Sequence, residues 1–468
     1  MLFARLPSVG GKQILVGGIC SELSLVGNRN YLPYADSWTR YNGFRTDSAM
    51  RICLVSTFPP APCGIATYCG YLIDGLLSVD KKVHVTVLTE GPVANDLRAR
   101  VCVIDAFSAD SDYSPAIVHQ VRACAPDVVH IQHEYGIFGF DGRFLRLLAD
   151  LREIRVPIVV TLHTVHTRSS LDLGCSWRTD RRPLTNVDIE KEQRQLCNVG
   201  DVIVVHQDRP MRSALIDQGA RADRVVSIPH GTFKGTRVIS ALAKEYLGYA
   251  ADSSLLVAFG YFEPSKNHQR LLQAFSLLRL RKPNAKLWIG GHVRWPSPPA
   301  REYKARIVNL IDQMGLNEHV TLWEGILSEP EVRVLLSAAD VGCFAYQEDT
   351  YSSSGALHRM LGNGKPVVAS NIPKFHELLR VAPEILVDPN RPEEIAGVLA
   401  RVLEDDSFRA LIASKALRFA EETSWPLVAD AHLDVYRRAI KAVAAEPAAA
   451  GTGPSKYAQA SSGQLRGA

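Results

Sequence analysis

The feature that most constrains the fold of this chain is an alternation of short apolar runs with longer segments in which apolar residues recur every three or four positions. The short runs, rich in β-branched residues, predict strands at 51–57, 83–89, 101–105, 128–132, 157–163, 201–206 and 225–230. The longer segments predict helices at 64–78, 115–124, 142–153 and 188–199. Strands that are apolar on both faces need cover on both sides, so the pattern predicts a parallel sheet between two layers of helices.

The same alternation repeats after a linker at 230–238. Further strands are predicted at 255–261, 286–291, 319–325, 341–346, 366–370 and 384–388. The economical interpretation is two successive doubly wound α/β domains, each Rossmann-like. The predicted parts are a non-core N-terminal extension (1–49), two domains (50–235 and 236–425), a long closing helix (426–445) and a disordered Ala/Gly/Ser-rich tail (446–468).

Length and composition are consistent with a soluble two-domain protein. The 468 residues suffice for two cores, and 46% apolar with 22% charged residues is ordinary for globular chains. A formal net charge of +4 gives no reason to expect a nucleic-acid partner. No segment has the ~20 apolar residues of a membrane-spanning helix, and the nine cysteines form no CxxC pair. We therefore expect a cytoplasmic location, with peripheral association at the inner membrane face left open.

Ligands of open parallel sheets bind beyond the carboxyl ends of the strands, so residues that follow strands are the candidates for function. In the first domain these are Gly64, which leads into a helix and permits close backbone approach to an anion, and the strand-end residues His133, Glu134 and His163. A turn glycine and buried structural histidines remain the alternative for each. No third ligand with diagnostic spacing accompanies the histidines, so no metal site is predicted.

In the second domain, Gly260 ends a strand and Lys266 precedes a helix that begins near His268, where an ammonium group suits a diphosphate. The strongest candidate is the segment from Ser352 through Ser353 and Ser354 to Gly355, at the start of another predicted helix. Hydroxyl and free N–H groups there would form an anion cradle without a metal, although a simple N-cap is the alternative. Glu348 lies just upstream, where a carboxylate could accept hydrogen bonds from sugar hydroxyls.

With these residues in view, the chain resembles the retaining glycosyltransferases of family 4 (group 1) over residues 50–445. The resemblance rests on RICLVSTFPPAPCGIATY, HIQHEYGIFG, TLH, SIPHGT, FGYFEPSKNHQRLLQAF, GLNEHVTLWEGILSEPEVRVLLSAAD and GKPVVAS, in that order. It implies the GT-B fold, with two Rossmann-like domains facing a central cleft. It also implies a nucleotide-sugar in the second domain and an acceptor mainly in the first. Lys266 matches the diphosphate-contacting lysine, His163 the histidine of the catalytic centre and Gly64 the glycine loop beneath the phosphates.

The chain departs from the family pattern in two features. Tyr261 stands where the family usually has an arginine, which removes a fixed positive charge near the phosphates. The two glutamates of the family signature fall on Tyr351 and Arg359, so ribose recognition must be made differently. Glu348 is a candidate for part of the missing acidic function. The SSSG segment resembles that of a divergent bacterial branch.

The sequence thus predicts an enzyme that moves a hexose from a nucleoside-diphosphate sugar to a hydroxyl acceptor, with retention of configuration and without a metal or other cofactor. The acceptor is expected to be a glycan or a lipid-linked sugar, in polysaccharide or glycolipid synthesis. His163, Lys266 and Glu348 are the candidate catalytic residues. Two alternatives stay open, a sugar-nucleotide epimerase of the same fold and an inactive binding subunit of a transferase complex.

Overall fold

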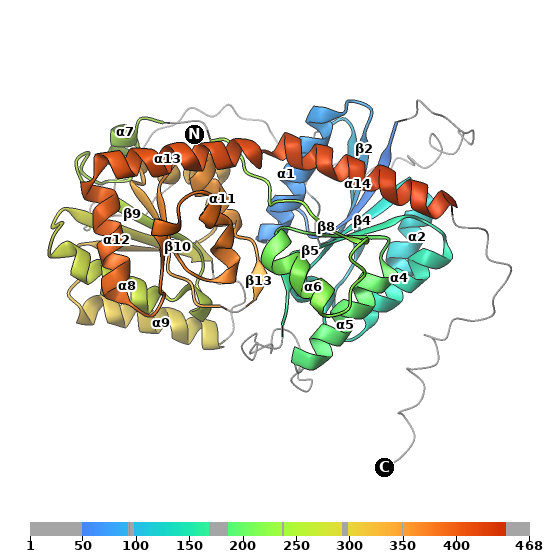
Figure 1. Ribbon diagram of the computed structural model, residues 1–468, viewed down its shortest axis with the longest axis horizontal. Coiled ribbons are helices and arrows are strands. Elements are labelled where there is room, and N and C mark those ends of the chain that lie inside the picture. The colour runs from blue at the N-terminus through green and yellow to red at the C-terminus, as the bar shows by residue number, and fades with distance from the viewer. Residues whose placement is uncertain are drawn as a thin grey trace, which may run out of the picture. The chain divides into compact units, whose positions relative to one another are not determined.

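The computed structural model describes residues 49–91, 93, 98–167, 186–235, 238–292, 298–348 and 350–445 (Figure 1). The chain forms two compact units. The first unit contains Ala49–Gly231, Thr350–Ser353 and the chain from Trp425 onward, and the second contains Thr232–Asp349 and Ser354–Ser424. The predicted N-terminal extension, apart from Ala49, and the predicted disordered tail lie outside the described residues.

The first unit is built on a parallel seven-stranded sheet with the order β3-β2-β1-β4-β5-β7-β8. Its strands are β1 (Arg51–Val55), β2 (His84–Glu90), β3 (Val101–Phe107), β4 (Val128–His133), β5 (Ile158–Leu162), β7 (Val202–Val205) and β8 (Val225–Ser227). Its helices are α1 (Gly64–Val79), α2 (Ser114–Cys124), α3 (Tyr135–Phe138), α4 (Arg143–Glu153), α5 (Asn186–Val199), a π-helix η2 (Asp208–Arg212), α6 (Ser213–Asp217) and α14 (Trp425–Ala445).

Alternate residues of the central strands enter opposite cores. Ile52 and Leu54 of β1 pack with apolar residues of α1 and α14, whereas Cys53 and Val55 pack with those of α2 and α4. Because successive side chains of a strand point to opposite faces, this division places helices on both sides of the sheet. The doubly wound arrangement predicted from the apolar runs is therefore confirmed.

The C-terminal helix α14 is part of the first unit and packs along α1 (Figure 1). The two helices approach closely at Gly75, where an added Cβ would lie 2.8 Å from the carbonyl oxygen of Trp425 and 3.0 Å from Cβ of Ala429. Buried residues of α14, Val428, Leu433 and Tyr436 among them, complete the core on this face of the sheet. The last long helix is thus a structural layer of the first unit.

The second unit has a parallel six-stranded sheet with the order β11-β10-β9-β12-β14-β15. Its strands are β9 (Ser254–Tyr261), β10 (Ala285–His292), β11 (Val320–Glu324), β12 (Val341–Phe344), β14 (Val367–Ser370) and β15 (Leu386–Val387). Its helices are α7 (Ser240–Tyr246), α8 (His268–Arg279), α9 (Pro298–Gln313), α10 (Glu329–Ala338), α11 (Gly355–Gly362), α12 (Pro392–Glu404) and α13 (Asp406–Glu422), with short 3-10 helices η3 (Pro264–Lys266), η4 (Pro373–Arg380) and η5 (Pro383–Ile385).

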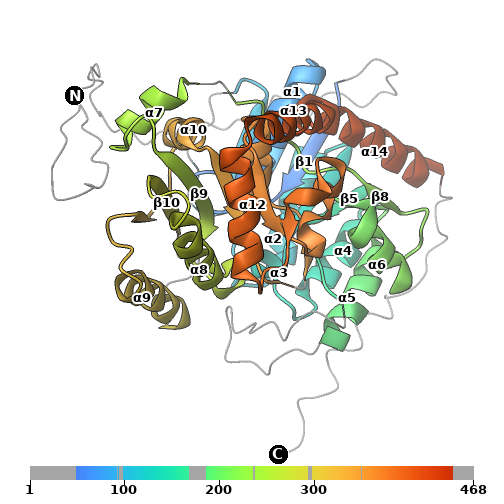
Figure 2. The same cartoon turned by 60° about the vertical axis from the view of Figure 1, so that its left-hand side comes forward.

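Helix α12 lies beside α8 in this unit (Figure 2), and their apolar faces join one continuous core with β9, β10 and β12. A two-residue antiparallel pair that the sequence did not predict, β6 (Thr164–Val165) with β13 (Tyr351–Ser352), belongs to the first unit. None of the helices in the described part of the chain has the length and apolar composition needed to cross a bilayer.

Candidate active site

The strand order of each sheet reverses direction at one point. In the second unit, β9 lies between β10 and β12. The connection after β9 leads to β10 on one side of this strand, and the connection after β11 leads to β12 on its other side. Open α/β sheets bind ligands at such a switch point, outside the carboxyl ends of the two strands concerned. The loops after β9 and β12 carry Gly260 and Lys266, and Tyr346 and Glu348, respectively.

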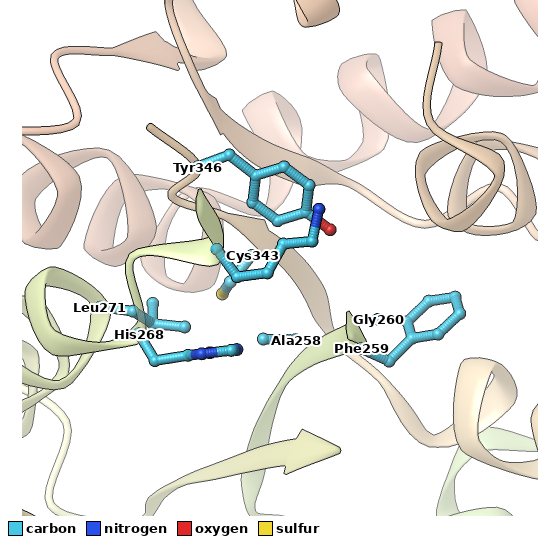
Figure 3. A pocket seen from close by; sticks show the side chains of 8 residues that line it. Ala258, Phe259, Gly260, His268, Leu271, Cys343 and Tyr346 are labelled. Carbon is cyan, nitrogen blue, oxygen red and sulfur yellow. The ribbon is translucent and has the colours of Figure 1, made fainter. Parts of the chain in front are cut away.

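Lys266 lines a small pocket at this switch point, around which Figure 3 shows Gly260, His268 and Tyr346. The pocket is lined by Ala258, Phe259, Gly260, Lys266, His268, Leu271, Cys343 and Tyr346. Nζ of Lys266 lies 4.1 Å from the centre of the Tyr346 ring and 3.1 Å from Oε1 of Glu263. The left-handed Asn267 (φ 51°) then turns the chain into α8, so the ammonium group is held just before a helix N-terminus.

The surroundings of Lys266 keep it charged. Burial alone lowers the pKa of its ammonium group, but Tyr346 and the carboxylates of Glu263 and Glu348 more than offset burial, and the net pKa lies above its ordinary value. The side chain is only 11% exposed. A buried cation with nearby carboxylates is a site at which an anionic ligand can replace the carboxylates as the partner.

Glu348 forms an ion pair with Lys374 of η4, with 2.6 Å between Oε1 and Nζ. Both side chains are largely buried, at 15% and 10% exposure. The structure thus commits the carboxylate of Glu348, which lies on the loop after β12, to a lysine that the sequence did not single out.

The predicted serine cradle is divided between two environments. Ser354 is the N-cap of α11, and its Oγ accepts a hydrogen bond from the backbone N–H of Leu357 at 3.3 Å. Gly355 is the first residue of this helix, as the sequence predicted. Ser352, in contrast, lies in β13, and Ser352 and Ser353 group with the first unit. Of the predicted hydroxyls, only that of Ser354 is placed at the helix terminus within the second unit.

The three residues that depart from the family pattern have partners of their own, and Tyr351 pairs with Val165 in the β6–β13 ladder. Tyr261 is the last residue of β9 and lies opposite His292 of β10. Arg359 of α11 forms an ion pair with Glu329, in the first turn of α10, at 2.5 Å. A basic side chain at this position therefore anchors one helix to the next.

In the first unit, the corresponding switch point lies between β1 and β4. Gly64 follows β1 and begins α1, and no atom lies within 4 Å of a Cβ added there, so the turn is open. Glu134 follows β4 and caps α3. Its Oε1 accepts a hydrogen bond from the backbone N–H of Tyr135 at 3.1 Å, and its Oε2 accepts one from the Thr164 hydroxyl at 2.7 Å.

His133, predicted on the acceptor side, is only 1% exposed. Its ring stacks on Phe138, and neither ring nitrogen has a hydrogen-bond partner. Burial lowers the pKa of His133 to about 3, with a smaller contribution from His166. The imidazole of His133 is therefore neutral. Of the two residues predicted on the acceptor side, His133 and Glu134, Glu134 has the more polar side chain.

His163 belongs to a buried hydrogen-bonded chain. Its Nε2 lies 2.9 Å from Oε1 of Gln132, and its Nδ1 lies 3.1 Å from Nε2 of His206. Because an amide oxygen only accepts, Nε2 of His163 carries the proton and Nδ1 accepts from His206. Burial, followed by the neighbouring His206, lowers the pKa of His163 well below its usual value. The predicted catalytic histidine is thus neutral and held in one tautomer.

The series of buried hydrogen bonds continues from Gln132 toward α14. The amide nitrogen of Gln132 lies 3.2 Å from Nε2 of His130, and Nδ1 of His130 lies 2.7 Å from the Tyr436 hydroxyl. All three side chains are fully buried. Gln132, His206 and Tyr436 were missed by sequence reasoning, because each acquires its role from a partner far away along the chain. Within the described part of the chain, no group of three or more His, Cys, Asp or Glu residues is placed to hold a metal ion.

Two parallel sheets with polar strand ends at their switch points are the arrangement of doubly wound α/β proteins, which bind their ligands at these points. A family model described as "Glycosyltransferase Family 4" matches residues 62–232, and one described as "Glycosyl transferases group 1" matches residues 244–419. Together they cover about three quarters of the chain. The chain belongs to the group 1 glycosyltransferases of GT-B fold and is an enzyme of that class.

Individual relatives support this assignment. D-inositol 3-phosphate glycosyltransferase of Nocardioides sp. is 25% identical over 364 residues, which cover 75% of this chain and 74% of the relative. Sucrose-phosphate synthase from Thermosynechococcus elongatus superposes with a TM-score of 0.66 at 20% identity, over 84% of this chain and 100% of that one. Anabaena Alr3699/HepE, solved in complex with UDP-glucose, gives a TM-score of 0.62 at 16% identity, over 83% and 100%.

Proposed function

We propose that this enzyme transfers a hexose from a nucleoside-diphosphate sugar to a hydroxyl acceptor, with retention of configuration and without a metal. The donor binds in the second unit, and the acceptor, a glycan or lipid-linked sugar, binds mainly in the first. The observation that carries the proposal is the buried Lys266 ammonium in a pocket at the switch point of the second sheet. A solved neighbour of the same fold is named as a complex with UDP-glucose, which supports this class of donor.

Breaking the bond between the sugar and the diphosphate leaves a negative charge on the departing phosphate. A fixed positive charge that is already desolvated stabilises this developing charge without reorganisation. Lys266 supplies one such charge, and the N-terminus of α11, capped by Ser354, supplies backbone N–H groups. Lys266 and the N-terminus of α11 thus supply the positive charge that a divalent cation supplies in metal-dependent transferases.

His163 has a positional part in this proposal. Its neutral ring donates from Nε2 to Gln132 and accepts at Nδ1 from His206, and it cannot act as a cation near neutral pH, since burial keeps its pKa low. Both ring nitrogens are engaged, so a contact to a hydroxyl of the transferred sugar requires the Gln132 amide to give up its hydrogen bond, and no covalent nucleophile is assigned. Glu348, close to Lys266, is proposed to accept hydrogen bonds from sugar hydroxyls.

The test is a thermal-shift screen of purified protein against UDP-, GDP- and ADP-sugars, followed by product analysis with each stabilising donor. A ligand at 100 times its dissociation constant should stabilise the protein by ~2.7 kcal/mol. Transfer that continues in the presence of a chelator supports the metal-free mechanism, whereas activity that vanishes and returns with magnesium or manganese contradicts it. Donor converted to an epimeric sugar without any acceptor would indicate an epimerase instead.

A further inference from the structure

Helix α11 is tied to the places where the chain passes between the two units. The chain leaves the first unit between Gly231 and Thr232, re-enters it briefly at Thr350–Ser353, just before α11, and returns to it again between Ser424 and Trp425. The crossing residues Thr232 and Thr423 are joined by a backbone hydrogen bond of 2.7 Å from the Thr232 N–H to the Thr423 carbonyl. Their hydroxyl oxygens also lie 2.7 Å apart. The crossings next to Thr232 and Thr423 are therefore joined by contacts within the second unit.

His358 of α11 connects this fastening to the helix. The residue is 1% exposed, and its Nδ1 lies 2.6 Å from the Thr232 hydroxyl. Its Nε2 lies 3.2 Å from both carboxylate oxygens of Glu377 in η4. A buried imidazole with a hydroxyl on one nitrogen and a carboxylate on the other is fixed in position and orientation.

The far end of α11 meets the same crossing segment. The N–H of Gly235 donates to the carbonyl of Gly362 at 3.1 Å. A Cβ added to Gly362 would lie 2.0 Å from the carbonyl oxygen of Phe233, so the backbones touch. Because the contact is made by backbone atoms at van der Waals distance, α11 and the segment that begins at Thr232 cannot shift independently.

The helix η4 links His358 to the proposed donor site. Lys374 and Glu377 are three residues apart in this 3-10 helix and therefore lie on one side of it. Lys374 pairs with Glu348, and the neighbouring Gln347 donates its N–H to the carbonyl of Ser265, the residue before Lys266, at 2.8 Å. Three residues after Lys374, the Glu377 carboxylate lies 3.2 Å from Nε2 of His358. One short element thus carries both the ion pair beside the donor loop and the hydrogen-bonding contact that reaches the crossing residues.

We propose that His358 is a positioning residue that transmits occupancy of the diphosphate site to the crossing residues Thr232 and Thr423. This inference rests on the proposed function. A diphosphate bound to Lys266 competes with Glu263 and Glu348 for the ammonium, which changes the balance between Glu348 and Lys374 and shifts η4. The shift reaches α11 and the crossings through Glu377 and His358. Crossings of this kind are where a two-domain enzyme absorbs changes of domain arrangement.

Hydrogen exchange with and without UDP, measured on the full chain by mass spectrometry, tests the inference. Peptides that cover 256–267 report on the donor loop, and peptides that cover 229–235 and 419–426 report on the crossings. In the wild type, UDP should slow exchange in both sets by at least about fivefold, the lower end of ordinary coupling between sites. In His358→Leu, protection of the donor loop should remain and protection of the crossings should fall below about twofold.

Two further variants keep the test decisive if His358→Leu fails to fold. Thr423→Val and Glu377→Gln remove one hydroxyl and one charge from the same path and should also uncouple the crossings. The matched control is Tyr249→Phe, which removes a buried hydroxyl hydrogen bond to Thr321 in the same unit but away from the path.

The outcomes separate the two ideas. Crossings that stay protected in every path variant, or that show no protection by UDP in the wild type, overturn the role of His358. An absence of protection at the donor loop itself in the wild type, for UDP and for the other nucleoside diphosphates, contradicts the proposed function and this inference with it.

Discussion

Lys266 is the residue on which the proposed donor site depends most. Tyr261 brings no positive charge where the resemblance to family 4 leads us to expect an arginine, so we expect Lys266 to carry an unusually large share of the proposed diphosphate contact. Lys266→Ala should weaken binding of a nucleoside diphosphate by ~1.5–3 kcal/mol, the scale of a charge-assisted hydrogen bond. Binding of the bare nucleoside should hardly change. Calorimetry with both ligands measures the difference.

The matched control for this experiment is Lys286→Ala. Lys286 lies in the same sheet, and its Nζ donates to the carbonyl of Glu318 at an exposed position. This variant should bind both ligands like the wild type. Equal losses for diphosphate and nucleoside in Lys266→Ala would mean that the residue supports the fold of the loop rather than the phosphate.

The effect expected of a substitution at His163 is on kcat rather than on donor binding. Its ring is already held by Gln132 and His206. His163→Ala should lower kcat much more than it weakens donor binding, since an interaction made only in the transition state appears in kcat. Steady-state kinetics alongside calorimetry in a variant confirmed to be folded provides the measurement. An unchanged kcat would assign the histidine to the buried core alone.

At the scale of single elements, the packing of α1 on α14 depends on one small side chain. A Cβ at Gly75 would meet the backbone of Trp425 at 2.8 Å, so Gly75→Val forces the two helices apart. We expect a loss of ~1–3 kcal/mol in the free energy of unfolding of the first unit, the usual cost of overpacking. Urea unfolding measures it.

The same helix offers a control. A Cβ at Gly70 would have only Pro59 nearby, at 3.9 Å, so Gly70→Ala fits without displacement. It should be neutral or stabilise by up to ~1 kcal/mol through helix propensity. Destabilisation by both substitutions would show that helix α1 tolerates no side chain at either position, and that close packing at Gly75 is not special.

Most elements could be predicted because their apolar pattern is local. The run at 128–132 became β4, and the segment 64–78 became α1 with the predicted first residue. The β6–β13 pair could not be predicted, because two residues of strand carry no periodicity and their partners lie far apart in sequence. The site shows the same limit. Lys266 and Ser354 follow strands and are visible locally, whereas Lys374, Gln132 and His206 acquire partners only through tertiary contacts.

At the scale of the whole molecule, the two units differ in how many histidines they bury in neutral form. In the first unit, burial is the main cause that lowers the pKa of five histidines, to about 3 for His133 and about 4 for His166 and His432. Burial also lowers the pKa values of His130 and His163 well below the ordinary value. In the second unit, burial lowers the pKa of His268 to about 3 and also lowers the pKa values of His319 and His376.

This difference predicts that the first unit loses stability first on mild acidification. An unfolded histidine takes up a proton below about pH 6.5, whereas the buried one stays neutral. The unfolded state therefore binds more protons, and the free energy of unfolding decreases as the pH is lowered. Each of the five histidines should contribute a loss of about 1 kcal/mol between pH 7 and 5.5. Glu192, whose pKa burial raises to about 7, acts in the opposite direction but is a single group.

Urea unfolding at both pH values, followed by hydrogen exchange in peptides assigned to each unit, tests this prediction. At pH 5.5, the urea midpoint of the first unit should fall well below that of the second. Equal shifts of both midpoints would mean that the buried histidines of the first unit accept protons in the folded state.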